Sequence, residues 1–263
     1  MTIASLLQPP QDLRVLISAG AAGIGAGLAR AFHESGARVY VCDIDGAAID
    51  RITAELPGVA GSIADVADQE QVDQVFNETE RAFGGLDVLI NNAGIAGPTG
   101  GIDEVEPVDW KKTVDINLVG QYYFARRAVP MLKNSTKNPC LIAMASVAGR
   151  LGYAFRTPYA ATKWGIVGMV KSLAIELGPS GIRVNTILPG IVEGERMNSV
   201  IAARAKTVGV DFETMRQEYL NKISLRRMVT VDDIAAMALF LCSPGARNVT
   251  GQVISVDGNV EYL

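Results

Sequence analysis

The sequence of 263 residues is poor in the side chains that most often bind metal ions, with three cysteines and one histidine. Cys42, Cys140 and Cys242 are widely spaced and form no Cys-x-x-Cys pair, which excludes a disulfide framework and a cysteine zinc site. With His33 as the single histidine, no histidine-rich metal site is available either. We therefore expect no metal cofactor, and a reducing compartment, the cytoplasm.

The chain also lacks an excess of positive charge and any long apolar run. Its 24 basic and 28 acidic residues give a formal net charge of −4, whereas a nucleic-acid-binding domain usually carries a basic face. There is no run of about 18 uncharged apolar residues to cross a membrane, and the first residues do not read as a secretory signal. We expect a small-molecule substrate as partner, and neither nucleic acid nor a membrane.

What the sequence does contain is a regular alternation of two hydrophobic patterns. Short β-branched runs occur at Arg14–Ser18, Ala37–Cys42, Gly58–Ile63, Val88–Asn91, Cys140–Met144, Arg183–Leu188 and Gln252–Val256. Between most of them lie segments with helical spacing, at Ile24–Ser35, Gln69–Phe83, Val108–Leu132, Tyr159–Leu177 and Val231–Leu241. The pattern predicts the α/β class, a doubly wound parallel sheet of about seven strands with helices on both faces.

No linker divides this alternation, because glycine and proline are scattered at turns. Residues 1–263 are therefore interpreted as one Rossmann-type domain. The segment 191–227 departs from the alternation, since it follows a strand and carries two helical patterns, Met197–Thr207 and Phe212–Ile223. Insertions at strand ends usually cover the ligand crevice in such folds, so we predict that this segment is a helical substrate lid.

A glycine-rich turn joins the first strand to the first helix. Glycines there let backbone N–H groups approach a phosphate, and the helix dipole adds about half a positive charge. The pattern is not G-x-G-x-x-G, because Leu28 occupies the third glycine position, nor is it a Walker A loop. An ordinary strand–helix turn is the alternative. The predicted dinucleotide contacts in this turn are Ser18, Gly20, Ala22, Gly23, Ile24 and Gly25.

Asp43 ends the second strand about 20 residues further on, where a carboxylate can accept hydrogen bonds from the adenosine ribose. Its charge would repel the 2′-phosphate of NADP, and no arginine or lysine lies in the glycine turn or directly after Asp43. We therefore expect NAD rather than NADP as the cofactor. The alternative is a solvated turn aspartate, because Asp43 to Gly46 also reads as a turn.

Two further strand ends supply candidate cofactor contacts. Asp65 and Val66 follow the third apolar run, which places a carboxylate near the adenine; Asp65 alternatively caps the helix Gln69–Phe83. Asn92, Ala93 and Gly94 end the fourth strand, where small residues let the backbone lie along the cofactor. A plain turn is the alternative for these three.

The candidate catalytic group combines Tyr159, Lys163 and Ser146. Tyr159 and Lys163 are four residues apart, and Pro158 is compatible with a helix start, so both side chains project from one helix face. Ser146 follows the strand Cys140–Met144, which brings it to the same crevice. Taken alone, Tyr-x-x-x-Lys would be read as a surface pair and Ser146 as a turn residue.

These residue types suit proton transfer that accompanies hydride transfer. Tyrosine, with a pKa of about 10, is a poor base at neutral pH. An ammonium group about 4 Å away, at an effective dielectric constant of about 20, favours phenolate by about 4 kcal/mol, a ceiling of about three pKa units. Ser146 can donate a hydrogen bond to the substrate oxygen and stabilise developing charge there.

Together these motifs resemble the short-chain dehydrogenase/reductase family, in its short single-domain NAD(P)-dependent branch. The resemblance runs from the glycine turn through Asn91-Asn92-Ala93-Gly94, Ser146, Tyr159-x-x-x-Lys163 and Pro189-Gly190 to Val256-Asp257-Gly258. It implies that Asn117 holds a water that links Lys163 to bulk solvent. It also implies that Pro189, Gly190 and Val192 lie in the segment that contacts the nicotinamide carboxamide, and that Tyr159 and Lys163 contact the cofactor as well.

The sequence departs from the family pattern at three places. The usual Thr-Gly at the start of the turn is Ser18-Ala19, and a small residue is retained. The hydroxyl residue often found four positions after the glycine of Pro-Gly is Gly194, which leaves one cofactor contact to be replaced or lost. The usual final Gly of Val-Asp-Gly-Gly is Asn259, with no evident mechanistic meaning.

Arg150 and Arg156 lie between Ser146 and Tyr159 and should flank the crevice. Two arginines there can hold an anionic group, so we predict Ser146, Arg150, Arg156 and Tyr159 as substrate contacts. The substrate would be a polar or acidic hydroxy compound such as a sugar or a sugar acid. Alternatively, the arginines pair with lid glutamates or face water.

The sequence thus predicts an NAD-dependent oxidoreductase that transfers a hydride between nicotinamide and a secondary alcohol or ketone. The alternatives are an NADP-dependent ketone or 3-oxoacyl reductase, an NAD-dependent epimerase or isomerase, and a non-catalytic NAD-binding regulator. The segment Tyr159–Leu177 is apolar nearly all round, which predicts burial on two sides. The family resemblance implies a homotetramer in which Val108–Leu132 shares that interface.

Overall fold

The computed structural model describes residues 2–262, and its centre is a sheet of seven strands in the order β3-β2-β1-β4-β5-β6-β7. All neighbouring strands are parallel. The strands are β1 (Arg14–Ser18), β2 (Arg38–Asp43), β3 (Ala60–Ile63), β4 (Val88–Asn91), β5 (Cys140–Met144), β6 (Arg183–Pro189) and β7 (Val253–Val256). The doubly wound parallel sheet is therefore confirmed, with strand ends within one or two residues of those expected.

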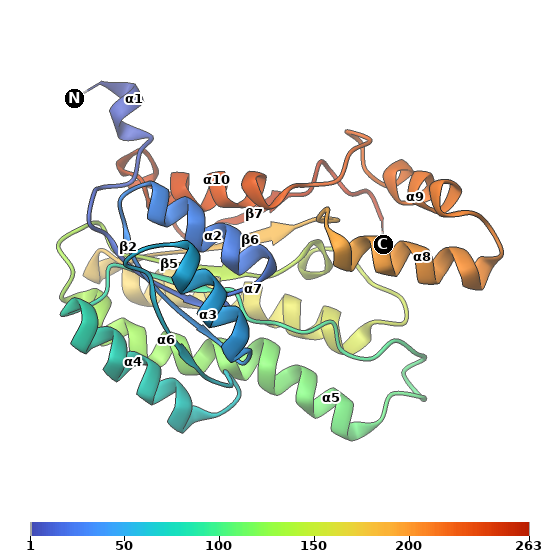
Figure 1. Cartoon of the computed structure of the whole chain (residues 1–263), viewed down its shortest axis with the longest axis horizontal. Helices are drawn as coiled ribbons and strands as arrows, with labels where there is room; N and C mark the ends of the chain where they lie inside the picture. The colour runs from blue at the N-terminus through green and yellow to red at the C-terminus, as the bar shows by residue number, and fades with distance from the viewer. Residues whose placement is uncertain (1, 263) are drawn as a thin grey trace.

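Helices cover both faces of the sheet (Figure 1). They are α1 (Ile3–Leu6), α2 (Gly23–Glu34), α3 (Gly46–Glu55), α4 (Gln69–Phe83), α5 (Pro107–Val114), α6 (Gly120–Lys133), α7 (Thr157–Leu177), α8 (Glu195–Val208), α9 (Phe212–Asn221) and α10 (Val231–Cys242). Among residues 2–262, no helix combines the length and the apolar character that a membrane crossing requires.

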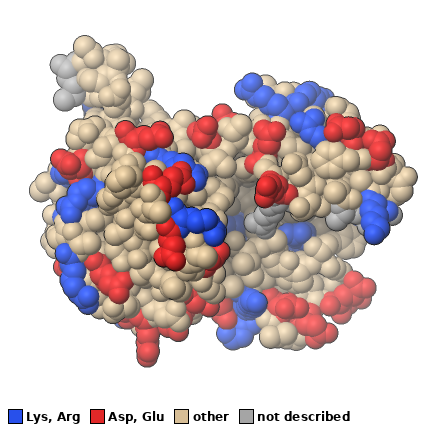
Figure 2. Space-filling model, in the orientation of Figure 1, with Lys and Arg blue, Asp and Glu red and all other residues tan. Residues whose placement is uncertain are grey.

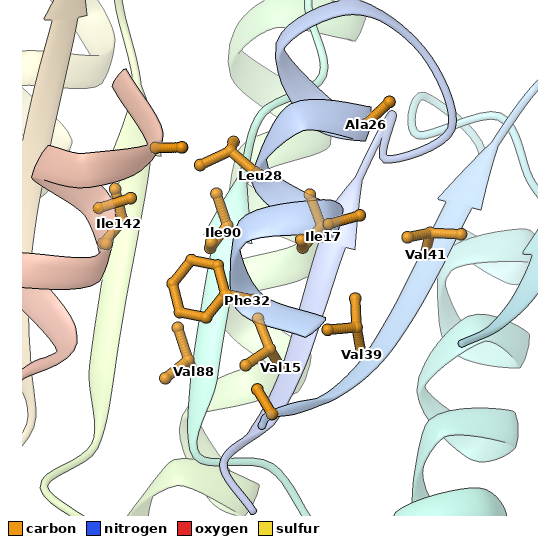
Figure 3. Packing of buried hydrophobic residues seen from close by; sticks show 14 of the residues in the cluster. Val15, Ile17, Ala26, Leu28, Phe32, Val39, Val41, Val88, Ile90 and Ile142 are labelled. Atoms are coloured by element: carbon orange, nitrogen blue, oxygen red, sulfur yellow. The ribbon is translucent and has the colours of Figure 1, made fainter. Parts of the chain in front are cut away.

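Each face of the sheet has its own apolar core. On one face, α2, α3 and α10 pack on side chains of the central strands, and Phe32 and Leu28 of α2 lie over Val15, Val88 and Ile90 (Figure 3). On the other face, α4, α6 and α7 form the second core. Because β1, β4 and β5 are buried on both faces, their central residues are continuously apolar rather than alternating. Strand β6 is also buried throughout, but it contains Arg183, Asn185 and Thr186.

Two helical segments differ from the expectation. Helix α3 was not predicted from the sequence. It follows the N-cap residue Asp45 and buries only Ala48, Ile49 and Ile52. The segment Val108–Leu132 is not one regular helix, because a wide π turn at Asp115–Val119 separates α5 from α6. Such widened turns often occur at functional sites.

The strand order places a crevice at the carboxyl edge of the sheet. The chain runs from β1 outward to β2 and β3, and then returns to the other side of β1 with β4. The loops after β1 and β4 therefore leave in opposite directions, which opens a ligand crevice between them.

Residues 191–227 form a helical lobe at this edge, which projects away from the body in Figure 1. It contains α8 and α9, and has an apolar core of its own that includes Ile201, Met215 and Leu220. Val147 beneath the lobe and Val260 of the C-terminal segment complete that core. Figure 2 shows this face hollowed between the rounded body and the helical lobe. The lid role of the lobe stays a prediction.

Candidate functional site

The turn after β1 leads directly into the N-terminus of α2 through a tightly packed glycine-rich backbone. Ala19 and Gly23 have positive φ values of 48° and 52°. A Cβ on Gly25 would lie 1.9 Å from the carbonyl oxygen of Ala19, so only glycine fits this tight approach of turn and helix. The N-cap Ala22 makes no side-chain cap, and no acidic residue occupies the first turn of α2. Uncapped N–H groups at a helix start fit a pyrophosphate.

Asn92 and Ser18 hold this turn in place. The Asn92 side-chain amide donates to the carbonyl oxygens of Ser18 and Ala19 at 3.1 and 3.0 Å. The Ser18 hydroxyl oxygen accepts from the backbone N–H groups of Asn92 and Ala93 at 3.0 and 3.1 Å. These two side chains, expected as cofactor contacts, therefore tie the end of β1 to the end of β4 and set the width of the crevice.

Asp43 lies beside the glycine turn, at the end of β2. One carboxylate oxygen accepts from the N–H of Ala21 at 3.2 Å, and the other accepts from the N–H of Asp45, also at 3.2 Å. The carboxylate is thereby fixed at the rim of the turn with lone pairs left over, since an ionised carboxylate has about four acceptor positions. A ribose whose pyrophosphate lay on α2 would find its acceptor here.

Asp65 and Val66 lie on the loop after β3. The Asp65 carboxylate accepts from the N–H of Ala67 at 2.9 Å. The alternative role of Asp65 as helix cap is wrong, because Asp68 caps α4 by accepting from the N–H groups of Glu70 and Gln71. Val66 is buried, and a Cβ on Gly120 would lie 2.9 Å from the Val66 carbonyl oxygen, so α6 directly supports this loop.

Asn117 is the buried residue of the π turn Asp115–Val119, and its side chain is fully hydrogen-bonded. Its side-chain oxygen accepts from the N–H of Ile95 at 2.7 Å. Its amide donates to the Ile95 carbonyl at 3.0 Å and to the Thr162 hydroxyl at 3.2 Å. Asn117 is fully buried, and it fastens the loop after β4 to α7. The sequence analysis missed Ile95, because only its backbone takes part.

Lys163 and Tyr159 lie together on the first turns of α7, as their spacing predicts. The Lys163 ammonium lies 5.5 Å from the centroid of the Tyr159 ring and donates to the carbonyl oxygen of Met144 at 3.1 Å. A Cβ on Gly94 would lie 3.3 Å from both the Lys163 nitrogen and the Asn117 oxygen. Gly94 thus keeps the backbone close to the buried ammonium group.

Ser146 stands at the end of β5, where it caps the short 3-10 helix Val147–Gly149. Its hydroxyl oxygen accepts from the N–H of Ala148 at 3.2 Å, so the hydroxyl proton is left to donate elsewhere. A Cβ on Gly149 would lie 2.9 Å from the Lys163 carbonyl oxygen. This close packing seats the Ser146 segment directly on the helix that carries Tyr159 and Lys163.

The Pro189–Val192 segment leaves the sheet at the far side of the crevice. The N–H of Gly190 donates to the Val256 carbonyl at 3.0 Å, and a Cβ on Gly190 would lie 2.6 Å from the Cβ of Asp257. Val192 forms a β-bridge with Val229. The segment is therefore held by the end of β7 and by the exit from the helical lobe.

The two candidate substrate arginines have different surroundings. The Arg150 guanidinium forms a 2.6 Å ion pair with Asp257 and also donates to the Val260 carbonyl, so its charge is neutralised by the C-terminal segment. The alternative in which Arg150 pairs with a glutamate of residues 191–227 is therefore wrong, because its partner is Asp257. Arg156 instead lies over the Tyr159 ring, with the guanidinium carbon 5.8 Å from the ring centroid.

The described part of the chain contains no group of three His, Cys, Asp or Glu side chains arranged to hold a metal ion. The donor set of the crevice is instead a phenol, an ammonium group, a hydroxyl and an amide. This set can move a proton to or from an alcohol oxygen beside a dinucleotide, which is the chemistry of Tyr159, Lys163, Ser146 and Asn117.

Known proteins are similar to this chain over nearly its whole length. A family model described as enoyl-(acyl carrier protein) reductase matches residues 19–260. L-fucose dehydrogenase of Bos taurus is 36% identical over 247 residues, which cover 94% of this chain and 88% of that protein. Galactitol 2-dehydrogenase of Agrobacterium fabrum is 36% identical over 246 residues, covering 92% and 95% of the two chains.

Solved structures are similar over nearly the whole chain. A crystal structure of an actinorhodin polyketide ketoreductase with NADPH has a TM-score of 0.89 and 28% identity, and the match covers 95% of this chain and 97% of that one. A 3-ketoacyl-(acyl-carrier-protein) reductase from Brucella melitensis in complex with NADH has a TM-score of 0.82 and 31% identity, covering 93% and 96%. One of these relatives is thus described with NADPH and the other with NADH.

Proposed function

The chain belongs to the short-chain dehydrogenase/reductase family and is an oxidoreductase acting on CH–OH groups, and from this premise we propose an NAD-dependent dehydrogenase of a sugar or polyol. The single observation that carries the proposal is the juxtaposition of Tyr159 and Lys163 on α7, in a chain whose glycine turn lies beside Asp43. NAD, when bound, supplies the acceptor for the hydride of the alcohol carbon.

The residues that would hold the cofactor form one continuous edge. The N–H groups at the start of α2 would bind the pyrophosphate, and Asp43 the adenosine ribose. Asp65 and Val66 lie where the adenine would be expected, and Pro189, Gly190 and Val192 where the carboxamide would be. The Asp43 carboxylate supports NAD over NADP, because a 2′-phosphate would place like charges side by side.

Proton transfer is the task of the side chains themselves. Tyr159, as phenolate, takes the proton of the substrate hydroxyl during oxidation and returns it in the reverse direction. The nearby Lys163 ammonium favours the phenolate form, and Ser146 donates a hydrogen bond to the substrate oxygen. Asn117 supports a proton relay from Lys163, in the role that family membership suggests.

The substrate class is supported by the relatives and by the arginines. L-fucose dehydrogenase and galactitol 2-dehydrogenase are named for a sugar and a polyol. Since Asp257 neutralises Arg150, the pair of arginines expected for an acidic substrate is reduced to Arg156. A neutral polyhydroxy compound is therefore favoured, and a sugar acid is the second candidate because Arg156 faces the site.

The test is a screen at 340 nm with NAD+ or NADP+ over sugars, polyols, hydroxy acids and simple alcohols. We expect NADH formation with a polyhydroxy substrate, and a loss of turnover in Tyr159→Phe with NADH affinity retained. Oxidation of NADPH by a 3-oxoacyl thioester alone would favour the reductase alternative. Conversion of a sugar without net NADH formation would favour an epimerase. NADH binding with no turnover on any compound would favour the regulator.

A homotetramer is part of the proposal. On α7, Trp164 and Ile175 are 51% and 81% exposed in the single chain, and Tyr122 of α6 is 49% exposed. Large exposed apolar side chains of this kind are suited to contact with a symmetric partner. Light scattering at micromolar concentration tests this, and a monomer would contradict it. The cytoplasmic location stays a prediction.

A further inference from the structure

Arg156 is the last residue before α7, and its side chain turns back over the aromatic rings of the site. The guanidinium carbon lies 5.5 Å from the centroid of Tyr153 and 5.8 Å from that of Tyr159. The two rings meet edge to face, with centroids 6.5 Å apart. The Lys163 ammonium is 5.5 Å from the Tyr159 ring centroid. Arg156 and Lys163 therefore both lie within about 6 Å of this centroid, the range of cation–π attraction.

The Arg156 charge is not neutralised by a carboxylate. Its two terminal nitrogens donate to neutral acceptors, the Thr99 hydroxyl and the Ala96 carbonyl, each at 3.0 Å. Its Nε atom is buried without a hydrogen-bond partner, and no carboxylate of the described residues lies within 4.0 Å of the guanidinium. Arg150, six residues earlier, pairs instead with Asp257.

The loop before α7 is built to hold Arg156 there. Phe155 has a φ of 61°, a left-handed conformation that a bulky residue rarely adopts. Its carbonyl accepts from the N–H of Gly100 at 3.0 Å, and the N–H of Arg156 donates to the Tyr153 carbonyl at 3.2 Å. The chain thus reverses direction at Phe155. The Arg156 guanidinium is then held by hydrogen bonds to residues 96–99 and lies over the Tyr159 ring at the start of α7.

We propose that Arg156 is a positioning residue that acts through Tyr159, as a second cation beside Lys163 that favours the phenolate. The inference rests on the proposed role of Tyr159 as the acid–base group. It gives Arg156 a task that needs no anionic substrate, and it explains why an arginine is held by neutral partners rather than by a carboxylate.

The other ionisable groups facing this cluster come from α7, its preceding loop and the lobe. Lys163 and Tyr153 are described above. Tyr219 of α9 lies near Tyr153 and Arg156 from the side of the lobe. The pKa of its phenol is raised, first by burial and then by Tyr153 and Glu218, although Arg204 and Arg156 act to lower it. Arg156 thus acts on the neighbouring Tyr219 phenol in the direction that the proposal gives it at Tyr159.

The test compares Arg156→Met with Arg156→Lys, and with Arg247→Met as a control that removes an exposed charge after α10. The guanidinium carbon lies 5.8 Å from the centroid of the Tyr159 ring. For charges about 6 Å apart at an effective dielectric constant of about 20 to 40, loss of the cation should raise the apparent pKa of kcat/KM by about one to two units. The lysine variant should restore part of the shift, and the control should show none.

A second measurement needs neither substrate nor turnover. Tyrosinate absorbance at 295 nm is followed against pH in the wild type, Arg156→Met and Tyr159→Phe. We expect a low-pH tyrosinate transition that Tyr159→Phe abolishes and Arg156→Met shifts upward by about one unit. Circular dichroism confirms that each variant is folded, and if the methionine variant is not, Arg156→Gln replaces it.

An unchanged tyrosinate transition together with an unchanged pH profile would overturn the proposal. A higher KM for acidic substrates only, at constant apparent pKa, would also overturn it and assign Arg156 to substrate binding. If no substrate is turned over while the tyrosinate transition still shifts, the proposed dehydrogenase function fails but the coupling of Arg156 to Tyr159 stands.

Discussion

Gly149 packs the Ser146 segment tightly against the backbone of α7, so a single methyl group there tests the geometry of the site. In Gly149→Ala the new Cβ would lie 2.9 Å from the Lys163 carbonyl oxygen, 3.3 Å from its carbonyl carbon and 3.4 Å from a Val167 methyl. An ordinary contact is 3.4 Å or more, and the opposing atoms belong to the backbone of a long helix. The Ser146 segment must therefore move away by about half an ångström.

The magnitude follows from that displacement. Overpacking of this kind costs about 1–3 kcal/mol of stability. A misplacement of about 1 Å can cost about 100-fold in rate, so half that distance is expected to lower kcat about 10-fold. NADH affinity should change little, because the glycine turn and Asp43 lie on other strands.

We would measure kcat, the dissociation constant of NADH and the midpoint of thermal unfolding for Gly149→Ala, with Gly152→Ala as the matched control. A Cβ on Gly152 meets nothing within 4 Å, and its φ is not positive. The control should have a kcat within twofold of the wild type. If Gly149→Ala also keeps the wild-type kcat and thermal midpoint, the packing of Ser146 against α7 does not set the rate, and the reasoning is refuted.

Three further predictions concern the cofactor, the sheet and the C-terminal segment. Asp43→Ala should weaken NADH binding about 10- to 100-fold and reduce discrimination against NADPH, with Asp45→Ala as control; isothermal titration measures both, and unchanged discrimination would contradict the ribose role. The fully buried Asp87 carboxyl would have its pKa raised by burial, but hydrogen bonds from Arg14 and Ser135 hold the pKa below its usual value. The stabilisation by the Asp87 carboxylate is therefore present above the pKa of the unfolded state and is lost as the pH falls through the pKa of the folded state. Asp87→Asn should lower the free energy of unfolding by about 2–4 kcal/mol at pH 7, and this free energy should then decline less steeply below pH 4. Chemical unfolding at a series of pH values tests this, and an unchanged dependence of the free energy of unfolding on pH would count against it. Asn259 has a φ of 61°, so Asn259→Ala should be less stable than Asn259→Gly by about 1 kcal/mol, and the reverse order in thermal unfolding would exclude a conformational role.

The sheet could be predicted closely because burial on both faces leaves a strong local pattern. Strands β1, β4 and β5 begin and end where their apolar runs do. The helix α3 was missed because only three of its residues are buried, which is too weak a periodicity in ten residues. The π turn was also invisible in sequence, since the bonds between Asn117 and the Ile95 backbone produce no pattern.

The site was predictable where chemistry and spacing coincide, and not where partners come from distant loops. Tyr159 and Lys163 are neighbours because four residues make about one helical turn. Arg150 and Arg156 looked equivalent in sequence, yet one meets Asp257 across 107 residues and the other meets Thr99 across 57. Asn259 had no evident meaning in sequence, and its amide donates to the Ser224 hydroxyl at 2.7 Å.

That last contact bears on how the lobe can move. The entry and exit of the lobe are joined to each other, since Glu193 and Val229 share a 2.8 Å backbone bond. The C-terminal segment adds a separate anchorage, where Ser224 donates its N–H to the Asn259 carbonyl at 3.0 Å. If the bond between Glu193 and Val229 were the only attachment, the lobe could rotate about that point as a hinge. The additional bonds between Ser224 and Asn259 restrict this rotation. We therefore predict that any movement of α8 and α9 carries residues 257–261 with it, so that hydrogen exchange in both should speed up or slow down together.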